Sequence, residues 1–269
     1  MASRSFWKGY LKLSLVTCPV AMTPATSENQ KVRFHTLNRA TGNRVISRYV
    51  DAETGDALDD DEQVKGYQRG ENDYVILEDE ELDSVALEST RTIDIEMFVP
   101  RDEVEWIWYD KPHYLTPDDP VGEEAFSVIR DAMGSTGMLG ISRLVMYRRE
   151  RAVLLEPRDR GIVLWTLRYG DEVRHPDVYF EGIGRSKPDP NLLSLVERLI
   201  EERTQPWDAS MVDDPVQERL LDLIASKKKG RKPSPSRKNP DHEPASNVVN
   251  IMDALRKSLA SEAKPAKKR

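Results

Sequence analysis

The sequence predicts a mainly β fold followed by helices, and two observations support this prediction. Up to about residue 185, apolar residues occur in short runs or alternate with polar residues, which is typical of strands. From about residue 190, apolar residues recur at helical spacing instead. We therefore expect a β-rich core over 1–185, a helical C-terminal arm over 190–226 and a disordered, Lys/Arg-rich tail over 227–269.

Three segments near the N-terminus are expected to be strands that present bases on one face. They cover residues 7–15, 31–36 and 44–50, and the first two alternate strictly. The bases on these faces are Lys8, Lys12, Lys31, Arg33, Arg44 and Arg48. Lysine and arginine are also ordinary on exposed sheet faces, so a solvated surface is the alternative to a polyanion-binding surface.

Residues 140–175 are expected to form a β-meander. Three apolar runs, at 144–147, 152–155 and 162–167, are joined by short charged links, so neighbouring strands should be antiparallel. We expect arginines at the turns, where their planar guanidinium groups suit phosphate. The arginines of this stretch that could contact DNA are Arg143, Arg148, Arg149 and Arg151. The alternative is that these turns are simply solvated.

The other elements follow from local patterns. Between residues 51 and 109 we expect an acidic turn at 51–61, a strand at 74–77, an acidic helical turn at 78–87, and alternating strands at 90–98 and 104–109. An exposed proline-rich connection at 112–120 should follow, and then a helix at 123–133 that Gly134 stops. Two further helices are expected at 192–200 and 214–224. The aromatic residues of 104–109 could stack on bases, but we expect them to pack in the core.

The tail combines free charge with one amphipathic segment. Lys227, Lys228 and Lys229 open its basic linker and are further candidates for DNA contact. Residues 247–260 are expected to form a short helix that docks on another protein, because a single tethered helix is marginal alone. Its apolar residues are Val248, Ile251, Met252, Leu255 and Leu259.

Charge is distributed unevenly along the chain. The formal net charge is −7, but residues 1–50 carry eight Lys/Arg and one acid, whereas residues 51–83 carry fourteen acids and two bases. Residues 227–269 carry thirteen bases and four acids. A polyanion would therefore meet the basic segments rather than the average charge.

Composition and the absence of known motifs argue against several classes of protein. Cys18 is the single cysteine, so we expect no disulfide or Cys-based zinc site and a reducing, cytoplasmic location. No run is long enough to span a membrane. Phosphate-loop and hydrolase motifs are missing, and the four histidines have no metal-ligand spacing. We expect no cofactor, no metal and no catalysis, although carboxylates that converge only in three dimensions could form a metal-dependent nuclease.

The chain resembles a known family, the bacterial Ku proteins. The matching stretches include Trp7-Lys8-Gly9, Val64-Lys65-Gly66-Tyr67, Tyr74-Val75-Ile76-Leu77, Phe98-Val99-Pro100, Lys111-Pro112-His113-Tyr114-Leu115, Leu167-Arg168-Tyr169, Glu218-Arg219-Leu220-Leu221 and Met252-Asp253-Ala254-Leu255. They follow the family's order over nearly the whole chain.

The resemblance implies a fold and a function. The fold is a Ku-type β-barrel core with DNA-encircling elements, followed by a helical arm for dimerisation. The function is a homodimeric ring that binds linear double-stranded DNA ends without reading sequence, and that recruits and stimulates an ATP-dependent ligase, ligase D, in non-homologous end joining. Such a protein repairs double-strand breaks in the bacterial cytoplasm, in association with the nucleoid.

The sequence departs from the family pattern in one loop. Many relatives carry a cysteine cluster with zinc-ligand spacing in the region of 41–55, where this chain has Thr41, Asp51 and Thr54. We therefore expect no zinc and a loop held by ordinary turn hydrogen bonds. Besides the DNA-end clamp, two hypotheses stay open: the metal-dependent nuclease, and a general DNA-binding adaptor that relies on its basic tail.

Overall fold

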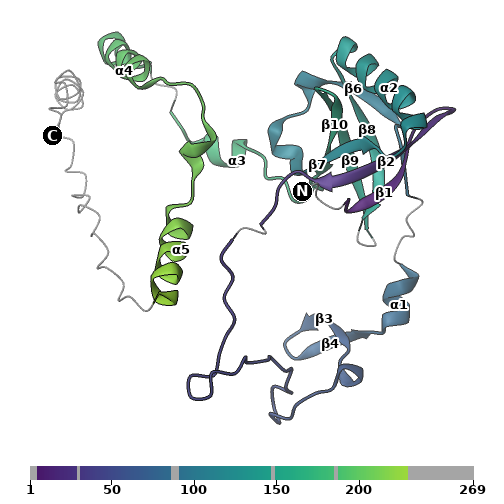
Figure 1. The fold of residues 1–269 in the computed structure, drawn as a ribbon, viewed down its shortest axis with the longest axis vertical. Coiled ribbons are helices and arrows are strands. Elements are labelled where there is room, and N and C mark those ends of the chain that lie inside the picture. Colours follow the sequence, from purple (N-terminus) through teal and green to yellow (C-terminus); the bar gives the residue numbers. More distant parts are fainter. Residues whose placement is uncertain (1–4, 29–30, 86–90, 147–148, 185–186, 230–269) are drawn as a thin grey trace. The chain divides into compact units, whose positions relative to one another are not determined.

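The computed structural model describes residues 5–28, 31–85, 91–146, 149–184 and 187–229. The chain divides into two compact units (Figure 1). The first contains the N-terminal segment and residues 34–175. The second contains the chain from Pro176 onward together with Lys31–Arg33.

Eight strands of the first unit form one sheet, in the order β5-β1-β2-β7-β10-β9-β8-β6. Neighbouring strands are antiparallel, except that β1 and β5 run parallel. The strands are β1 (Trp7–Leu13), β2 (Val16–Pro24), β5 (Thr92–Asp94), β6 (Met97–Pro100), β7 (Tyr109–Pro117), β8 (Met138–Met146), β9 (Arg149–Arg158) and β10 (Gly161–Leu167). The predicted mainly β core is confirmed.

The sheet closes on itself because its two edge strands are consecutive in the chain. Only Ile95 and Glu96 separate β5 from β6. The Ile95 N–H donates to the Lys12 carbonyl of β1 (2.9 Å), and the Glu96 N–H donates to the Ile141 carbonyl of β8 (2.9 Å). One length of chain therefore joins both edges, and the barrel leaves no long unpaired edge there.

The barrel interior is filled by aliphatic side chains and by one face of a helix. α2 (Glu123–Thr136) contributes Phe126, Ile129 and Met133 to the same core as the buried residues of the strands. This helix contacts both β2 and β8, which are not neighbours in the sheet. It therefore crosses an open end of the barrel. The helix predicted at 123–133 from the spacing of its apolar residues is confirmed. Its C-cap is Gly137 (φ 69°), not Gly134 as expected, since Gly137 adopts the left-handed conformation that commonly ends a helix.

The predicted β-meander is confirmed, since β8, β9 and β10 are antiparallel neighbours. The strands are longer than the apolar runs that predicted them. Arg149 and Arg151 were expected in a turn, but they lie in β9 and pair with Met146 and Leu144. The ladder continues past the packed core, where charged side chains keep contact with solvent.

The predicted strands at 31–36 and 44–50 are wrong. In this region the structure has two isolated bridges, between Leu37 and Arg44 and between Val50 and Ala57. A strand is stabilised by a half-buried face, whereas Phe34, Ile46 and Tyr49 are all exposed. Within the described part of a single chain, nothing covers this segment.

Two further predictions about strands need correction. Of residues 104–109, only Tyr109 lies in a strand, as the first residue of β7. The chain before it makes the 3₁₀ turns η2 (Arg101–Glu103) and η3 (Trp106–Trp108), and Trp106 is 79% exposed rather than packed in the core. Conversely, the proline-rich connection contributes to β7, which includes Pro112 and Pro117, and Pro19 lies inside β2. Proline is tolerated in a strand where its missing N–H is not needed by the ladder.

The first strand is shorter than expected. β1 ends at Leu13, where Ser14 adopts a left-handed conformation (φ 54°) and starts a hairpin into β2. Leu15 was expected on the buried face, but it sits in this turn and is exposed. The alternation of residues 7–13 was nevertheless interpreted correctly, because Leu11 is fully buried and Lys8 is exposed.

Between β2 and β5 the chain makes a long excursion, of which residues 34–85 are called the arm here. The arm contains η1 (Asp60–Glu62), a two-stranded sheet of β3 (Lys65–Gly70) and β4 (Asp73–Leu77), and α1 (Asp79–Ser84). None of the core side chains of the barrel comes from it. β4 and α1 confirm the predicted strand and acidic helical turn.

The second unit is helical, as predicted. It contains α3 (Asp177–Phe180), α4 (Pro190–Arg203), η5 (Ala209–Val212) and α5 (Pro215–Lys228). Asp189 and Asp214 cap α4 and α5 through their side chains, each followed by a proline at the first helical position. In the described residues of these helices no side chain is fully buried. Among the residues that the structure describes, no helix has the length and apolar character needed to cross a membrane.

Candidate nucleic-acid interface

The basic face predicted for β1 is present, but both of its lysines are paired with acids. The Lys8 ammonium lies 2.7 Å from an Asp118 carboxylate oxygen, and that of Lys12 lies 2.6 Å from Asp94. These acids come from the turn after β7 and from β5, so only the closed barrel brings them to the lysines. The pairing leaves little net positive charge on this face.

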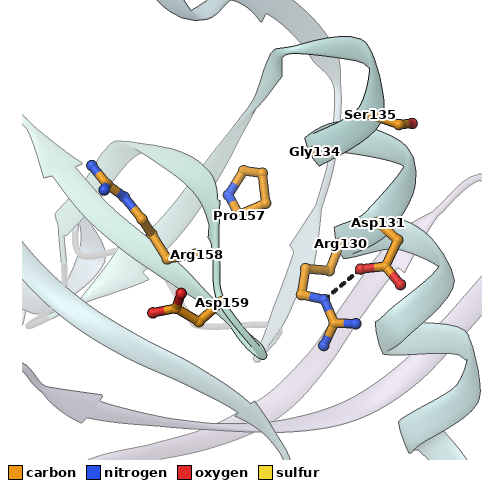
Figure 2. Close-up of a pocket in the computed structure, with 7 residues that line it drawn as sticks. All are labelled: Arg130, Asp131, Gly134, Ser135, Pro157, Arg158 and Asp159. Atoms are coloured by element: carbon orange, nitrogen blue, oxygen red, sulfur yellow. Dashed lines mark hydrogen bonds and ion pairs between the residues drawn. The ribbon is translucent and has the colours of Figure 1, made fainter.

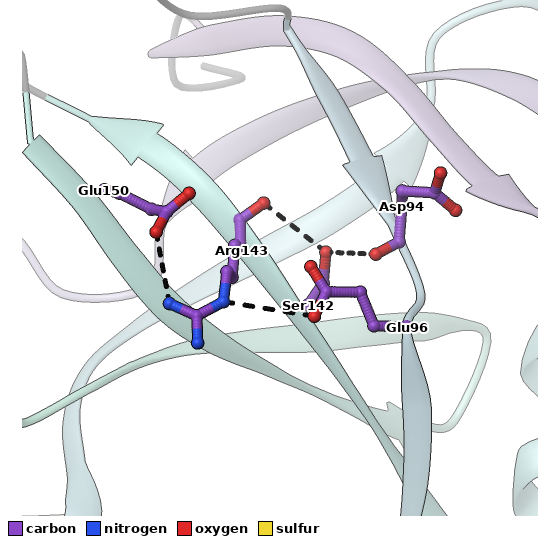
Figure 3. Close-up of polar contacts among 5 residues, drawn as sticks. All are labelled: Asp94, Glu96, Ser142, Arg143 and Glu150. Carbon is purple, nitrogen blue, oxygen red and sulfur yellow. Dashed lines mark hydrogen bonds and ion pairs between the residues drawn. The ribbon is translucent and has the colours of Figure 1, made fainter. Parts of the chain in front are cut away.

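Arg143 on β8 is also occupied (Figure 3). Its guanidinium lies 3.1 Å from the Glu150 carboxylate and 3.9 Å from that of Glu96. The hydroxyl of Ser142, the preceding residue of β8, donates to the Asp94 carbonyl of β5 (2.6 Å). Arg143 therefore lies between two acids where β8 meets the β5–β6 segment, and its positive charge is largely compensated there.

The arginines at the start of β9 differ from one another. Arg149 is exposed. The Arg151 guanidinium stacks over the Tyr169 ring, with 5.4 Å to the ring centroid, and the Tyr169 hydroxyl donates to the Glu150 carbonyl (2.8 Å). A stacked guanidinium keeps most of its N–H donors for another partner. Arg148, the third arginine predicted here, lies outside the described residues.

A run of bases without an acid in the sequence leads into the arm and continues along it. Residues 31–50 include five bases and no acid, and all five are exposed. Four of them, Lys31, Arg33, Arg44 and Arg48, were predicted as candidates for DNA contact. The fifth, Arg39, was missed because it belongs to a turn rather than to an alternating segment.

Two turns of the arm share one hydrogen-bonding pattern. The Oδ1 atom of Asn38 accepts the N–H groups two and three residues later (2.8 and 3.2 Å), and Oδ1 of Asp51 does the same (2.8 and 3.0 Å). Each turn contains a left-handed glycine, Gly42 (φ 73°) or Gly55 (φ 77°). These are Asx turns, and the prediction that turn hydrogen bonds hold this loop is confirmed.

The same turns do not fit a zinc ion. The side chains of Thr41 and Thr54 each accept a backbone N–H (3.3 Å), and the Asp51 carboxylate is already engaged. The N–H groups of Thr54 and Glu53 lower the pKa of Asp51. The ionised carboxylate therefore supports the turn above about pH 4, and this support is lost as the pH falls through the lowered pKa.

A small hollow lies between the end of α2 and the β9–β10 turn (Figure 2). Its volume is about 280 Å³, and its lining includes Arg130 and Arg158 together with Asp131 and Asp159. The Arg130 guanidinium pairs with Asp131 (2.7 Å), so the charges largely compensate. Among the residues that the structure describes, no group of three or more His, Cys, Asp or Glu side chains is placed to hold a metal ion. The geometry thus adds nothing in favour of a nuclease.

Comparison with known proteins agrees with the closed barrel. Residues 12–195 match the family model described as the Ku70/Ku80 beta-barrel domain. The chain belongs to the Ku family. The Ku-type barrel predicted from the sequence is thereby confirmed.

Several relatives in this family carry the name "Non-homologous end joining protein Ku". The relative from Methylocella silvestris is 66% identical and covers 100% of both chains. The relative from Allorhizobium ampelinum is 59% identical and covers 98% of both chains. The relative from Gluconacetobacter diazotrophicus is also 59% identical, over 97% of this chain and 99% of its own. Among solved structures, the SPOC domain of human PHD-finger protein 3 is 9% identical with a TM-score of 0.30, covering 61% of this chain and 95% of that one, which is too distant to bear on the fold.

The remaining candidates of this Ku-family chain lie near its C-terminus. Lys227 and Lys228 lie in the last turn of α5, and Lys229 is its C-cap, so the helix continues past the predicted boundary at residue 226. Lysines suit this position because their charge opposes the negative end of the helix dipole. The docking residues predicted at 247–260 lie outside the described part of the chain.

Proposed function

We propose that the protein is a non-catalytic clamp that binds the ends of linear double-stranded DNA as a homodimeric ring, in repair of double-strand breaks by non-homologous end joining. The observation that carries this proposal is the arm. The arm leaves and rejoins the barrel at the same end of the sheet. It carries exposed positive charge, and it exposes apolar side chains that nothing in the described chain covers.

The register of the sheet fixes where the arm begins and ends. β1 pairs antiparallel with β2 and parallel with β5, with Trp7 opposite Met22 and Tyr10 opposite Thr92. The end of β2 and the start of β5 therefore both lie at the end of the sheet where β1 begins. A long loop closed in this way on a rigid barrel is suited to reach around a ligand.

The charge of the arm suits the phosphate backbone. Arg39, Arg44 and Arg48 lie in the first unit, are exposed, and have no acid between them in the sequence. The cations of β1 and β8, by contrast, are held by carboxylates. Contacts to phosphate carry no base-sequence information, so binding through the arm would be independent of sequence.

The apolar residues of the arm support a dimer. Phe34, Ile46, Tyr67 and Ile76 are each more than half exposed, and an isolated two-stranded hairpin such as β3–β4 is marginal in water. α4 and α5 also expose apolar side chains, including Ile200 and Leu221. A second copy of the chain would cover such surfaces, and two arms would then close a ring.

The arm arginines give the first test. Replacing Arg39, Arg44 and Arg48 together by glutamine should weaken binding to every duplex alike. The slope of log K against log salt should become shallower by about 0.9 for each phosphate that the variant no longer neutralises. The measurement is a salt titration of duplex binding by fluorescence anisotropy.

The matched control is the double variant Lys8→Gln/Lys12→Gln. It also removes positive charge, but only from lysines that are paired with Asp118 and Asp94, so the slope should stay close to that of the unaltered protein. An unchanged slope in the arm variant, or an equal change in the control, would argue against DNA contact by the arm.

We also propose that the tail recruits an ATP-dependent ligase, ligase D, through Val248, Ile251, Met252, Leu255 and Leu259. The support is the helical spacing of these residues behind a basic linker. Removing residues 227–269 should leave the binding of DNA ends largely intact and reduce ligase stimulation severalfold in a joining assay. Equal stimulation with and without the tail would refute this docking role.

A further inference from the structure

One carboxylate on the outer face of the barrel binds two arginines. Glu156 lies on β9, and its side chain is 9% exposed. Its Oε1 atom accepts from Arg101 (3.0 Å) and from two nitrogens of Arg158 (3.0 and 2.9 Å). Its Oε2 atom accepts from the Trp165 indole N–H (3.1 Å). The carboxylate is thus fully engaged, whereas the side chains of Arg101 and Arg158 remain 47% and 61% exposed.

The charge balance of this cluster differs from that of the other barrel cations described above. Lys8 and Lys12 each pair with one acid, and Arg143 pairs with two. Around Glu156, two arginines pair with the same carboxylate, so neither has that acid to itself. A guanidinium has five N–H donors, and the contacts with Glu156 use one nitrogen of Arg101 and two of Arg158.

The surroundings hold both arginines in place. Trp165 packs edge-on against Tyr109, with 5.2 Å between ring centroids, and the backbone N–H of Arg101 donates to the Gly137 carbonyl (3.2 Å). Arg158 precedes a tight turn that Arg130 ties to α2 by donating to the Arg160 carbonyl (2.8 Å). Figure 2 shows Arg158 pointing away from Arg130, so the two arginines serve different contacts. Two anchored, half-exposed guanidinium groups are therefore presented in one fixed arrangement.

We propose that Arg101 and Arg158 form a contact site for a backbone phosphate of duplex DNA on the barrel, and that Glu156 is the positioning residue that aims them. This inference rests on the proposed DNA clamp and adds a second, rigid contact beside the arm. Arginine is suited to the role because its planar fork matches phosphate oxygens.

The variant Glu156→Gln tests the positioning role by the sign of its effect. Removing a negative charge beside two arginines should strengthen DNA binding if charge alone matters. If Glu156 aims the arginines, the affinity should instead fall, by about fivefold to tenfold, despite the gain in positive charge. The measurement is duplex affinity at fixed salt, with thermal unfolding as a check that the variant is folded. Stronger binding by a folded variant would overturn the positioning role.

The double variant Arg101→Gln/Arg158→Gln tests the site itself. We expect a salt dependence that is shallower by about 0.9, the value for one phosphate left without its arginines, while the Lys8→Gln/Lys12→Gln control stays unchanged. If this double variant binds normally while the arm variant Arg39→Gln/Arg44→Gln/Arg48→Gln is impaired, the phosphate site is wrong and the clamp stands. If neither variant is impaired, the proposed clamp itself is contradicted. If Glu156→Gln or the double variant does not fold, the single variant Arg101→Gln leaves Glu156 paired with Arg158 and should still weaken duplex binding.

Discussion

Replacing Gly9 by alanine is expected to destabilise the barrel by about 3 kcal/mol or more, which is a large part of the stability of a typical domain. A Cβ atom at this position would overlap the Arg91 carbonyl oxygen and the ring of Trp7. The Arg91 carbonyl accepts the Tyr10 N–H (2.8 Å) where β1 meets β5. Because this obstacle is backbone, it cannot move without opening the seam that closes the sheet.

Gly161→Ala is the matched control. Gly161 also lies in a strand of the barrel, but a Cβ atom there would have no neighbour nearer than 3.5 Å, and its stability should change by less than about 1 kcal/mol. Urea denaturation followed by circular dichroism compares the two variants. Similar midpoints for Gly9→Ala and the unaltered protein would contradict the described closure between β1 and β5.

Elements with a strong local period could be predicted from the sequence. The helix α2 was visible in the spacing of Phe126, Ile129 and Met133, and each of these side chains is buried. The meander was visible in three apolar runs with short links, which leave no geometry other than antiparallel neighbours. Both signals work because the apolar face of a single element is encoded in consecutive residues.

Features that depend on distant partners could not be predicted in this way. The alternation over 90–98 looks like one strand, but the chain changes partners at Ile95 and Glu96, from β1 to β8. The segment 31–36 alternates as a strand would, but among the described residues the segments 31–36 and 44–50 make no more than isolated bridges at Arg44 and Val50. Strand formation depends on a pairing partner and a covered face, and neither is encoded in the local sequence.

The candidate site shows the same division. The sequence identifies the bases, but not the acids that meet them: Asp118 is 110 residues from Lys8, and Asp94 is 82 residues from Lys12. The Glu156 cluster was missed because Arg101 and Trp165 reach it from other elements. The family was nevertheless identified correctly from short motifs, since these motifs lie in order along nearly the whole chain.

The second large expected effect is a preference for linear DNA over covalently closed circular DNA. A closed ring gains specificity from topology, because a linear duplex can thread it and a covalently closed circle offers no end. We expect the protein to prefer linear over closed circular DNA by at least about tenfold at near-physiological salt, or about 1.4 kcal/mol. Replacing residues 31–85 by a short Gly/Ser linker should abolish this preference while the barrel still folds, because the core contains no residue of the arm.

The measurement that tests the clamp most directly is a gel-shift competition with the full chain. A labelled short linear duplex is bound, and is then challenged with equal masses of unlabelled linear or covalently closed circular DNA. The proposed ring predicts that the linear competitor displaces the probe and that the circle leaves it bound. Equal displacement by both competitors would contradict the ring, and would leave a general DNA-binding adaptor in its place.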